Sequence, residues 1–130
     1  MGTEAQVIHL DANYLIRSAD LASKEARNMS QWLIQGETFA ASSIAWAEFL
    51  NGPVDRSEVR YATHLIQGRV VPFTRADAEM AANIFNASGR RRGSRPDCFI
   101  AATAICAGAS LATENRRDFQ PFVTAGLRLI

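Results

Sequence analysis

Short apolar segments alternate with helical patterns along this chain, and this alternation constrains the fold more than any other feature of the sequence. Five segments are predicted to be strands, at residues 7–10, 38–42, 69–73, 110–113 and 127–130. Strands that alternate with helices form a parallel sheet, which helices cover on both faces. We therefore expect one α/β domain over residues 1–130, in three layers, with a central sheet of four to five short strands.

Helix signals occupy the intervals between the expected strands. Apolar spacing and capping residues predict a helix that begins near residue 14 and further helices over residues 23–35, 43–50, 55–67, 74–85 and 94–106. Ser43 and Ser94 are expected to cap two of these helices, and Asn115, with Asp118 three residues later, is expected to cap a further one. Thr74 with Asp77 predicts a capping box at another helix.

Composition and charge limit the classes of function. The chain has 130 residues, of which 48% are hydrophobic and 21% are charged, and these values are typical of one globular domain. Its formal net charge is +1, so the protein as a whole does not attract nucleic acid strongly. A polyanion would have to bind a local basic patch.

The two cysteines and the N-terminus indicate a cytoplasmic protein. Cys98 and Cys106 lie on one expected helix and cannot pair with each other, which fits a reducing compartment. Cys98 is expected to fill the core, and a thiol nucleophile at the start of the helix is the alternative. Residues 1–6 lack a basic segment and no long apolar run follows, so we expect no signal peptide, myristoylation or membrane span.

Four acidic residues occupy positions at which a ligand could bind. Asp11 and Asp118 follow predicted strands, and Asp97 lies at the start of the apolar helix. Glu48 is the only charged residue of its apolar segment. In open parallel sheets, ligands bind outside the carboxyl ends of the strands. Simpler explanations are also open: Asp11 and Asp118 as helix caps, Asp97 as a partner of the helix dipole. Glu48 is either the exposed position of its helix or a buried charge that needs a partner.

Convergence of these acids at one edge of the sheet would create a site for a divalent metal. Two carboxylates about 4 Å apart repel each other by roughly 4 kcal/mol at an effective dielectric constant of about 20. Without a cation, some of them would be protonated and have raised pKa values. Mg²⁺ and Mn²⁺ remove this repulsion and prefer oxygen ligands. One or two such ions can activate a water molecule and stabilise the leaving oxygen of a phosphodiester.

A basic loop over residues 89–95 leads directly into Asp97. A solvated surface loop is the simpler explanation. Phosphate binding is an equally good explanation, because the loop lies beside an acidic residue. Arginine binds phosphate through paired hydrogen bonds and stacks on bases. The arginines of this loop are Arg90, Arg91, Arg92 and Arg95.

The histidines do not indicate another kind of active site. His9 lies on a predicted strand, on the same side as Asp11, and a buried, hydrogen-bonded histidine is the expectation there. His64 lies in a predicted surface helix. The sequence holds no serine–histidine or cysteine–histidine arrangement that supports a nucleophilic mechanism.

Four segments together resemble the motifs of PIN-domain ribonucleases, in the same order and over almost the whole chain. They are Val7–Asn13, Ser42–Phe49, Asp97–Ala104 and Leu111–Phe119. The resemblance implies a PIN-like fold. The small size of the chain is similar to that of the VapC toxins of toxin–antitoxin modules.

The resemblance implies a Mg²⁺- or Mn²⁺-dependent endoribonuclease that cleaves a structured RNA, such as tRNA or rRNA, and so inhibits translation. It also implies a homodimer and neutralisation by a VapB-type antitoxin. Asp11, Glu48 and Asp97 match the metal-binding acids of the family, and Asp118 matches a fourth, more variable one. The loop arginines would hold the RNA backbone. The residues that match supporting polar groups are Asn13, Thr113 and Asn115.

Two other classes of function compete with this one: a phosphoaspartate protein and a catalytically silent scaffold. A haloacid-dehalogenase-type phosphatase also has an Asp after its first strand, but its motif needs a second Asp where this chain has Asn13. A phosphoacceptor receiver needs a lysine near its end, and the only lysine is Lys24. A catalytically silent PIN-like scaffold that binds RNA or a protein is the remaining alternative, and metal binding would argue against it.

Overall fold

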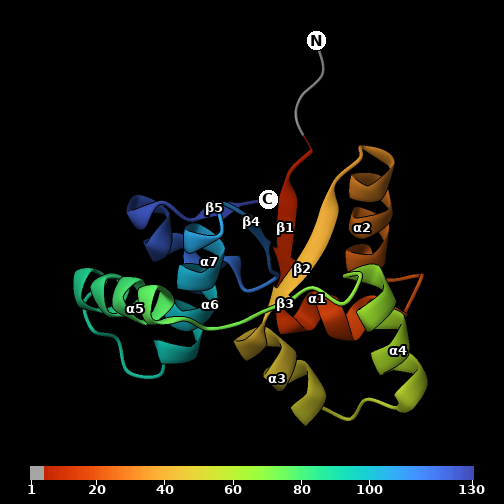
Figure 1. The fold of residues 1–130 in the computed structure, drawn as a ribbon, viewed down its shortest axis with the longest axis horizontal. Coiled ribbons are helices and arrows are strands. Elements are labelled where there is room, and N and C mark those ends of the chain that lie inside the picture. Colours follow the sequence, from red (N-terminus) through yellow and green to blue (C-terminus); the bar gives the residue numbers. More distant parts are fainter. Residues whose placement is uncertain (1–4) are drawn as a thin grey trace.

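The centre of the molecule is a five-stranded parallel sheet with the strand order β3-β2-β1-β4-β5 (Figure 1). The computed structural model describes residues 5–130, so the expectations for residues 1–4 lie outside it. The predictions of an α/β class and a parallel sheet are confirmed, and several strands are shorter than predicted. The strands are β1 (Val7–Leu10), β2 (Thr38–Ser42), β3 (Val70–Val71), β4 (Ser110–Ala112) and β5 (Arg128–Leu129).

Helices connect the strands at the predicted places, with ends that differ by a few residues. None of the helices within residues 5–130 combines the length and the apolar character that a bilayer span requires. The helices are α1 (Ala12–Arg17), α2 (Lys24–Ile34), α3 (Ser43–Asn51), α4 (Arg56–Leu65), α5 (Arg75–Ala87), α6 (Arg95–Cys106), α7 (Arg116–Phe119) and the 3₁₀ helix η1 (Gln120–Ala125).

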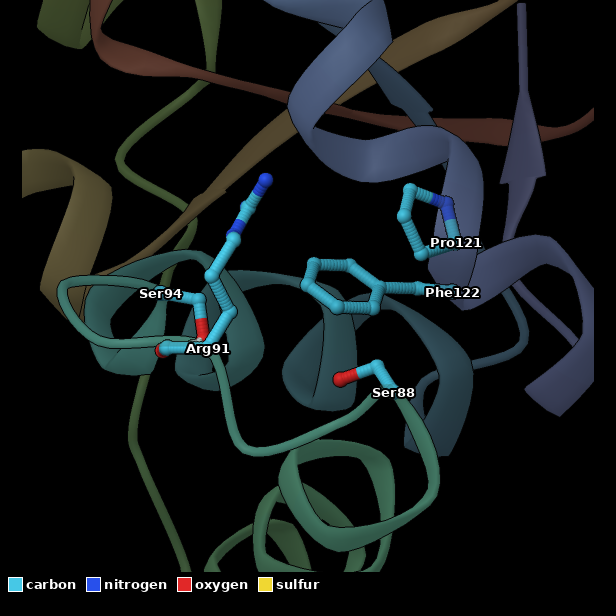
Figure 2. Close-up of a pocket in the computed structure, with 5 residues that line it drawn as sticks. All are labelled: Ser88, Arg91, Ser94, Pro121 and Phe122. Carbon is cyan, nitrogen blue, oxygen red and sulfur yellow. Dashed lines mark hydrogen bonds between the residues drawn. The ribbon is translucent and has the colours of Figure 1, made fainter.

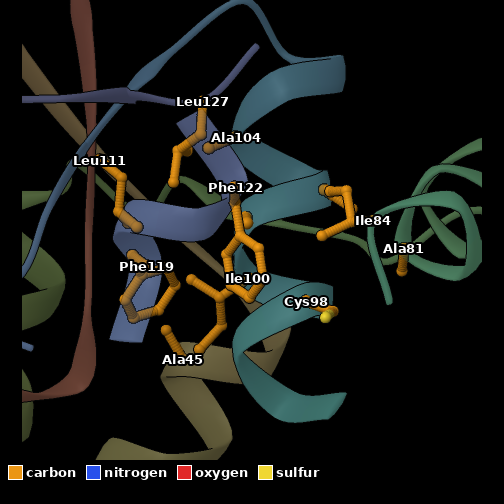
Figure 3. Close-up of a cluster of buried hydrophobic side chains, with 12 residues drawn as sticks. Ala45, Ala81, Ile84, Cys98, Ile100, Ala104, Leu111, Phe119, Phe122 and Leu127 are labelled. Atoms are coloured by element: carbon orange, nitrogen blue, oxygen red, sulfur yellow. The ribbon is translucent and has the colours of Figure 1, made fainter. Parts of the chain in front are cut away.

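Two apolar cores lie on opposite faces of the sheet (Figure 1). On one face, α1, α2 and α4 pack against β1 and β2. The β1 side chains Ile8 and Leu10 are fully buried there. On the other face, α5, α6, α7 and η1 enclose a second core around Ile100 (Figure 3). Helix α3 contributes Ala45 to one core and Phe49 to the other. α3 therefore lies at the end of the sheet and joins the two halves.

Helix α6 is apolar because it is enclosed between the sheet and α5. Small side chains such as Ala101 and Ala102 are fully buried and allow this close packing. Cys98 is also fully buried, which confirms that its side chain fills the core. Burial raises the pKa of its thiol, and this disfavours a thiolate nucleophile.

The helix caps agree with the predictions at α5 and differ by one residue at α3. Thr74 and Asp77 form the predicted capping box. At α3, Ser42 rather than Ser43 is the cap, and its hydroxyl accepts a hydrogen bond from the N–H of Ala45 at 3.0 Å. Ser42 still has the extended backbone that a cap requires, whereas the helix already begins at Ser43.

Ser94 and Asn115 stand at the starts of α6 and α7 but do not cap them with their side chains. A cap needs an extended backbone, and neither residue has one. The Ser94 hydroxyl donates instead to the carbonyl oxygen of Arg91 at 2.7 Å. These two cap predictions are therefore wrong. Ser94 holds the basic loop in place instead.

His9 is buried in β1, and the expectation that it is hydrogen-bonded is wrong at one ring nitrogen. The residue is 2% exposed, and its Nδ1 has no hydrogen-bond partner among the described residues. Burial lowers the pKa of His9 to about 4, although the charge of Asp77 opposes this change. The ring is therefore neutral at physiological pH. His64 is exposed on α4, as predicted.

Successive strands are added to one side of β1 as far as β3, and β4 and β5 are then added to the other side. The direction therefore reverses between β1 and β4. Ligands of open α/β sheets bind at such a reversal, beyond the carboxyl ends of the strands. Leu10 and Ala112 are paired and end their strands together. The next residues, Asp11 and Thr113, are therefore neighbours at the reversal.

Candidate active site

Asp11 is held firmly at the carboxyl end of β1. It is buried, and its carboxylate accepts hydrogen bonds from the Thr113 hydroxyl at 2.7 Å and from the N–H of Ala12 at 2.9 Å. Its own backbone N–H donates to the carbonyl oxygen of Ala112 at 3.0 Å. Burial raises the pKa of Asp11, although the two hydrogen bonds to its carboxylate oppose this change. The side chain caps α1, and its charge also raises the pKa values of Glu48 and Asp97, so the two explanations of Asp11 are compatible. Asp11, Glu48, Asp97 and Asp118 are called the acidic cluster below.

Three further polar residues surround Asp11 on neighbouring segments. The Thr113 hydroxyl donates to Asp11 and accepts a hydrogen bond from the N–H of Asn115 at 3.0 Å, so its direction is fixed. Asn13 accepts a long hydrogen bond of 3.5 Å from the N–H of Glu114 through its Oδ1 atom. The structure thus brings Thr113 to Asp11, whereas Asn13 contacts Glu114. Asn115 contributes its backbone N–H, and its side chain is exposed.

Asp97 lies in the first turn of α6 and is partly buried. Its pKa is raised to about 6 by burial and by the negative charges of Asp11 and Asp118, while the positive charge of Arg91 opposes this change. The start of a helix by itself stabilises a carboxylate and would lower its pKa. Burial and the neighbouring acids therefore act on the pKa of Asp97 in the direction opposite to the helix dipole.

Glu48 lies in the second turn of α3, on an exposed position of the helix. Its exposure agrees with the simpler of the two explanations for this residue. Partial loss of hydration raises the pKa of Glu48, and the charges of Asp11 and Asp97 raise it further. Glu48 is therefore exposed to solvent on one side and close to the acidic cluster on the other.

Asp118 lies in α7 and forms an ion pair with Arg91 of the basic loop. The distance between Arg91 Nη1 and Asp118 Oδ1 is 3.8 Å. Arg91 also lines a small cavity of about 50 Å³ beside Phe122, and Figure 2 shows its guanidinium group pointing away from Ser88 and Ser94. Asp118 therefore belongs to the acidic cluster, and it has a positively charged neighbour within the same chain.

The four loop arginines have different surroundings. Arg90 and Arg95 lie against the ring of Phe85, with guanidinium carbons 5.3 and 5.2 Å from its centroid. Arg92 is exposed and has no ion pair or hydrogen bond to the part of the chain that the structure describes. Of these arginines, only Arg91 forms an ion pair with an acid of the cluster in the described structure.

A polar network beside the site was not predicted from the sequence. The Tyr14 hydroxyl donates to Glu114 at 3.1 Å and accepts from Asn28 at 3.0 Å, and Lys24 forms a 2.8 Å ion pair with Glu114. The network joins α1, α2 and the loop after β4, which are the segments around Asp11. The only sequence signal was a tyrosine in an otherwise apolar helix start, because 100 positions separate it from Glu114.

The donor atoms at this edge of the sheet are carboxylate oxygens, which suit Mg²⁺ or Mn²⁺. Burial and neighbouring acids raise the pKa values of Glu48 and Asp97, and a divalent cation would offset the repulsion between these carboxylates. Within residues 5–130, no group of three or more His, Cys, Asp or Glu side chains is arranged to hold an ion. Mg²⁺ usually takes one or two protein carboxylates and keeps several waters, so Asp11 and Asp97 fit such an ion.

A comparison with protein families gives a match to the PIN domain model over residues 8–121. This range begins in β1, ends in η1 and contains every member of the acidic cluster. A comparison with curated proteins gives no match.

Solved structures with the same fold include chains from toxin–antitoxin systems. VapBC2 from Rickettsia felis, bound to a promoter DNA fragment, has a TM-score of 0.71 and 20% identity over 95% of this chain and 97% of that chain. VapBC-1 from nontypeable Haemophilus influenzae has a TM-score of 0.66 and 22% identity over 95% and 96%. VapBC-5 from Mycobacterium tuberculosis, of the VapBC family of toxin–antitoxin systems, has a TM-score of 0.59 and 20% identity over 96% and 99%. The prediction of a PIN-like fold is confirmed.

Proposed function

Because this chain belongs to the PIN domain family, we propose that it is a metal-dependent endoribonuclease that hydrolyses RNA phosphodiester bonds. One observation carries the proposal. Burial and the charges of Asp11 and Asp97 raise the pKa of Glu48, and burial and the charges of Asp11 and Asp118 raise that of Asp97. Acids from four segments of the chain are therefore close enough to affect one another at the reversal of the sheet.

Asp11 and Asp97 are the less exposed acids of the cluster, and they would hold Mg²⁺ or Mn²⁺ directly. Asp118 would complete the same site. The ion, when bound, would lower the pKa of a water molecule and stabilise the leaving oxygen of the phosphodiester. One or two ions are compatible with the number of carboxylates. Thr113 would keep Asp11 in a fixed orientation through the hydrogen bond between them.

Glu48 has the role of orienting the attacking water or completing the metal site. Its carboxyl group is exposed on one side, so water reaches it, and its raised pKa favours proton uptake nearer to neutral pH. Asn13 would assist Asp11 or a bound water. The arginines of the loop that precedes Asp97 supply the positive charge that an RNA backbone requires, although the net charge of the chain is only +1.

We further infer that the protein is the toxin of a toxin–antitoxin module and acts as a cytoplasmic homodimer. The similar structures named VapBC support an antitoxin of the VapB type as its partner. Inhibition of translation by cleavage of a structured RNA, such as tRNA or rRNA, would be the toxic activity. Sedimentation equilibrium of the isolated protein tests the dimer.

A catalytically silent scaffold that binds RNA or a protein is the second candidate function. This candidate is favoured because, within residues 5–130, no three ligating side chains are arranged around one point. A scaffold of this kind would bind RNA without cleaving it, and its affinity for RNA would not depend on Mn²⁺.

The decisive experiment is cleavage of structured RNA by the purified protein in the presence of Mg²⁺, Mn²⁺ or EDTA. The unsubstituted protein should cleave only with a metal, and Asp97→Asn should lose the activity. Asp20→Asn is the matched control, because Asp20 is an exposed acid in the turn between α1 and α2. Full cleavage by Asp97→Asn, or cleavage that persists in EDTA, would contradict the proposed function.

A further inference from the structure

Arg91 differs from the other loop arginines because its guanidinium group forms an ion pair with an acid of the site. Its Nη1 atom is 3.8 Å from Asp118 Oδ1, and both side chains are about half exposed, at 50% and 52%. Its charge also reaches Asp97, where it opposes the rise in pKa that burial and the neighbouring acids cause. Arg91 is therefore a positive charge that the chain itself supplies to two members of the cluster.

The backbone of Arg91 is fixed, whereas its guanidinium group is held weakly. Its carbonyl oxygen accepts hydrogen bonds from the Ser94 hydroxyl at 2.7 Å and from the Ser94 N–H at 3.2 Å. The 3.8 Å ion pair, by contrast, is longer than a hydrogen bond. Partly exposed pairs of this kind exchange partners easily, because solvent screens them. The loop therefore presents a movable cation from a fixed position.

We propose that Arg91 occupies the acidic cluster as a substitute cation in the metal-free protein and turns to an RNA phosphate once a divalent ion binds. This inference rests on the proposed function. A divalent ion held by Asp11 and Asp97, with Asp118 as a neighbour, would neutralise the charges that attract Arg91 and would repel its guanidinium group. A phosphate of the bound RNA would then be the nearest anion, and a guanidinium group can hold it through two parallel hydrogen bonds.

The other loop arginines contribute to RNA binding in a different way. Arg90 and Arg95 are occupied with the ring of Phe85, and Arg92 is exposed in solvent. They add positive charge to the surface and attract RNA in general. Arg92 is therefore the matched control for Arg91, since it lies in the same loop, has the same charge and does not pair with the acids.

The test compares Arg91→Ala with Arg92→Ala in two measurements. In the first, Mn²⁺ binding to the RNA-free protein is followed by calorimetry. Arg91→Ala should bind Mn²⁺ about two- to fivefold more tightly than the unsubstituted protein, because a competing cation of an exposed pair is gone. In the second, the KM for RNA should rise about tenfold in Arg91→Ala, as expected for the loss of hydrogen bonds to a charged group. Arg92→Ala should leave Mn²⁺ affinity unchanged and raise the KM less.

A merely structural role of Arg91 would not give opposite changes in metal affinity and RNA affinity. Equal Mn²⁺ affinity in Arg91→Ala and Arg92→Ala, or weaker Mn²⁺ binding by Arg91→Ala, would overturn the inference. Equal KM values for the two variants would overturn it as well. If the unsubstituted protein bound no Mn²⁺ and cleaved no RNA, the proposed function would fail first, so the two failures are distinguishable.

Discussion

Asp97 shows how the site differs from an ordinary helix start. An acid in the first turn of a helix is normally stabilised in its charged form. Here burial and the charges of Asp11 and Asp118 raise the pKa of the residue to about 6. A protonated Asp97 is a poor metal ligand, so metal binding requires the carboxylate. Cleavage at low metal concentration should therefore decline as the pH falls below about 6.

The pKa of Asp97 can be measured directly by carbon-13 NMR of aspartate-labelled, metal-free protein. We expect a titration midpoint of about 6 for Asp97 in the unsubstituted protein. In Asp11→Asn the midpoint should be lower, because removal of a neighbouring negative charge favours the carboxylate of Asp97. A midpoint that is the same in both proteins would show that the two acids are not close enough to interact.

Thr113 is expected to act on the metal through Asp11. Thr113→Val keeps the shape of the side chain and removes the hydroxyl that donates to Asp11 at 2.7 Å. Loss of such a partner of a metal ligand typically weakens metal affinity by about 10- to 100-fold. The Mn²⁺ concentration for half-maximal cleavage should rise accordingly. The control is Thr124→Val, because Thr124 is exposed and away from the acids. An unchanged metal requirement in Thr113→Val would contradict the role of this hydrogen bond.

Strand β1 combines a functional end with an unusual centre. Asp11 follows its last residue, whereas His9 lies within it, buried and with an unpartnered Nδ1. A pKa lowered from 6.5 to about 4 means that the folded protein disfavours the protonated ring. The unfolded chain then binds more protons between these pH values, so the free energy of unfolding decreases as the pH falls through this range.

Substitution of His9 tests this pH dependence. Between about pH 7.5 and about pH 4.5, the neutral ring of His9 should account for a loss of roughly 2 to 3 kcal/mol in the free energy of unfolding. His9→Leu should lack this loss, and His64→Gln should retain it because His64 is exposed. The measurement is urea denaturation at both pH values. An identical pH dependence for His9→Leu and the unsubstituted protein would contradict a neutral, buried histidine.

Most elements could be predicted because their signals are local. Apolar runs and caps such as Thr74 predicted the strands and helix starts, and the order of elements predicted the sheet. The cap predictions at Ser94 and Asn115 were wrong because a cap depends on backbone conformation, which the residue type does not determine. The cap of α3 is Ser42 rather than the predicted Ser43 for the same reason.

Contacts between distant segments could be predicted only in part. The parallel sheet was enough to predict that Asp11 and Asp118 lie at the same edge. The ion pair of Arg91 with Asp118 and the network of Tyr14 with Glu114 depend on the orientation of side chains in loops. The missing partner of His9 depends on the packing of its neighbours, which the sequence pattern does not specify.

The molecule as a whole collects its acids through its topology. β1 and β4 are adjacent at the centre of the sheet, although about 100 residues separate them in the chain. α3 joins the two cores at the end of the sheet (Figure 1). Glu48 on this helix is close enough to Asp11 and Asp97 for their charges to raise its pKa. α6 starts there with Asp97, and α7 follows with Asp118. The parallel sheet thus positions four acids that are scattered along the sequence, and this arrangement is the basis of the proposed metal site.

The most direct test of the central claim is Mn²⁺ binding to the RNA-free protein, measured by electron paramagnetic resonance. We predict that the unsubstituted protein and Asp20→Asn bind Mn²⁺ with the same affinity. Asp11→Asn should bind it at least about tenfold more weakly, because a direct ligand is lost. Equal affinity of Asp11→Asn and the unsubstituted protein, or no Mn²⁺ binding by any of them, would contradict a metal site at the carboxyl edge of the sheet.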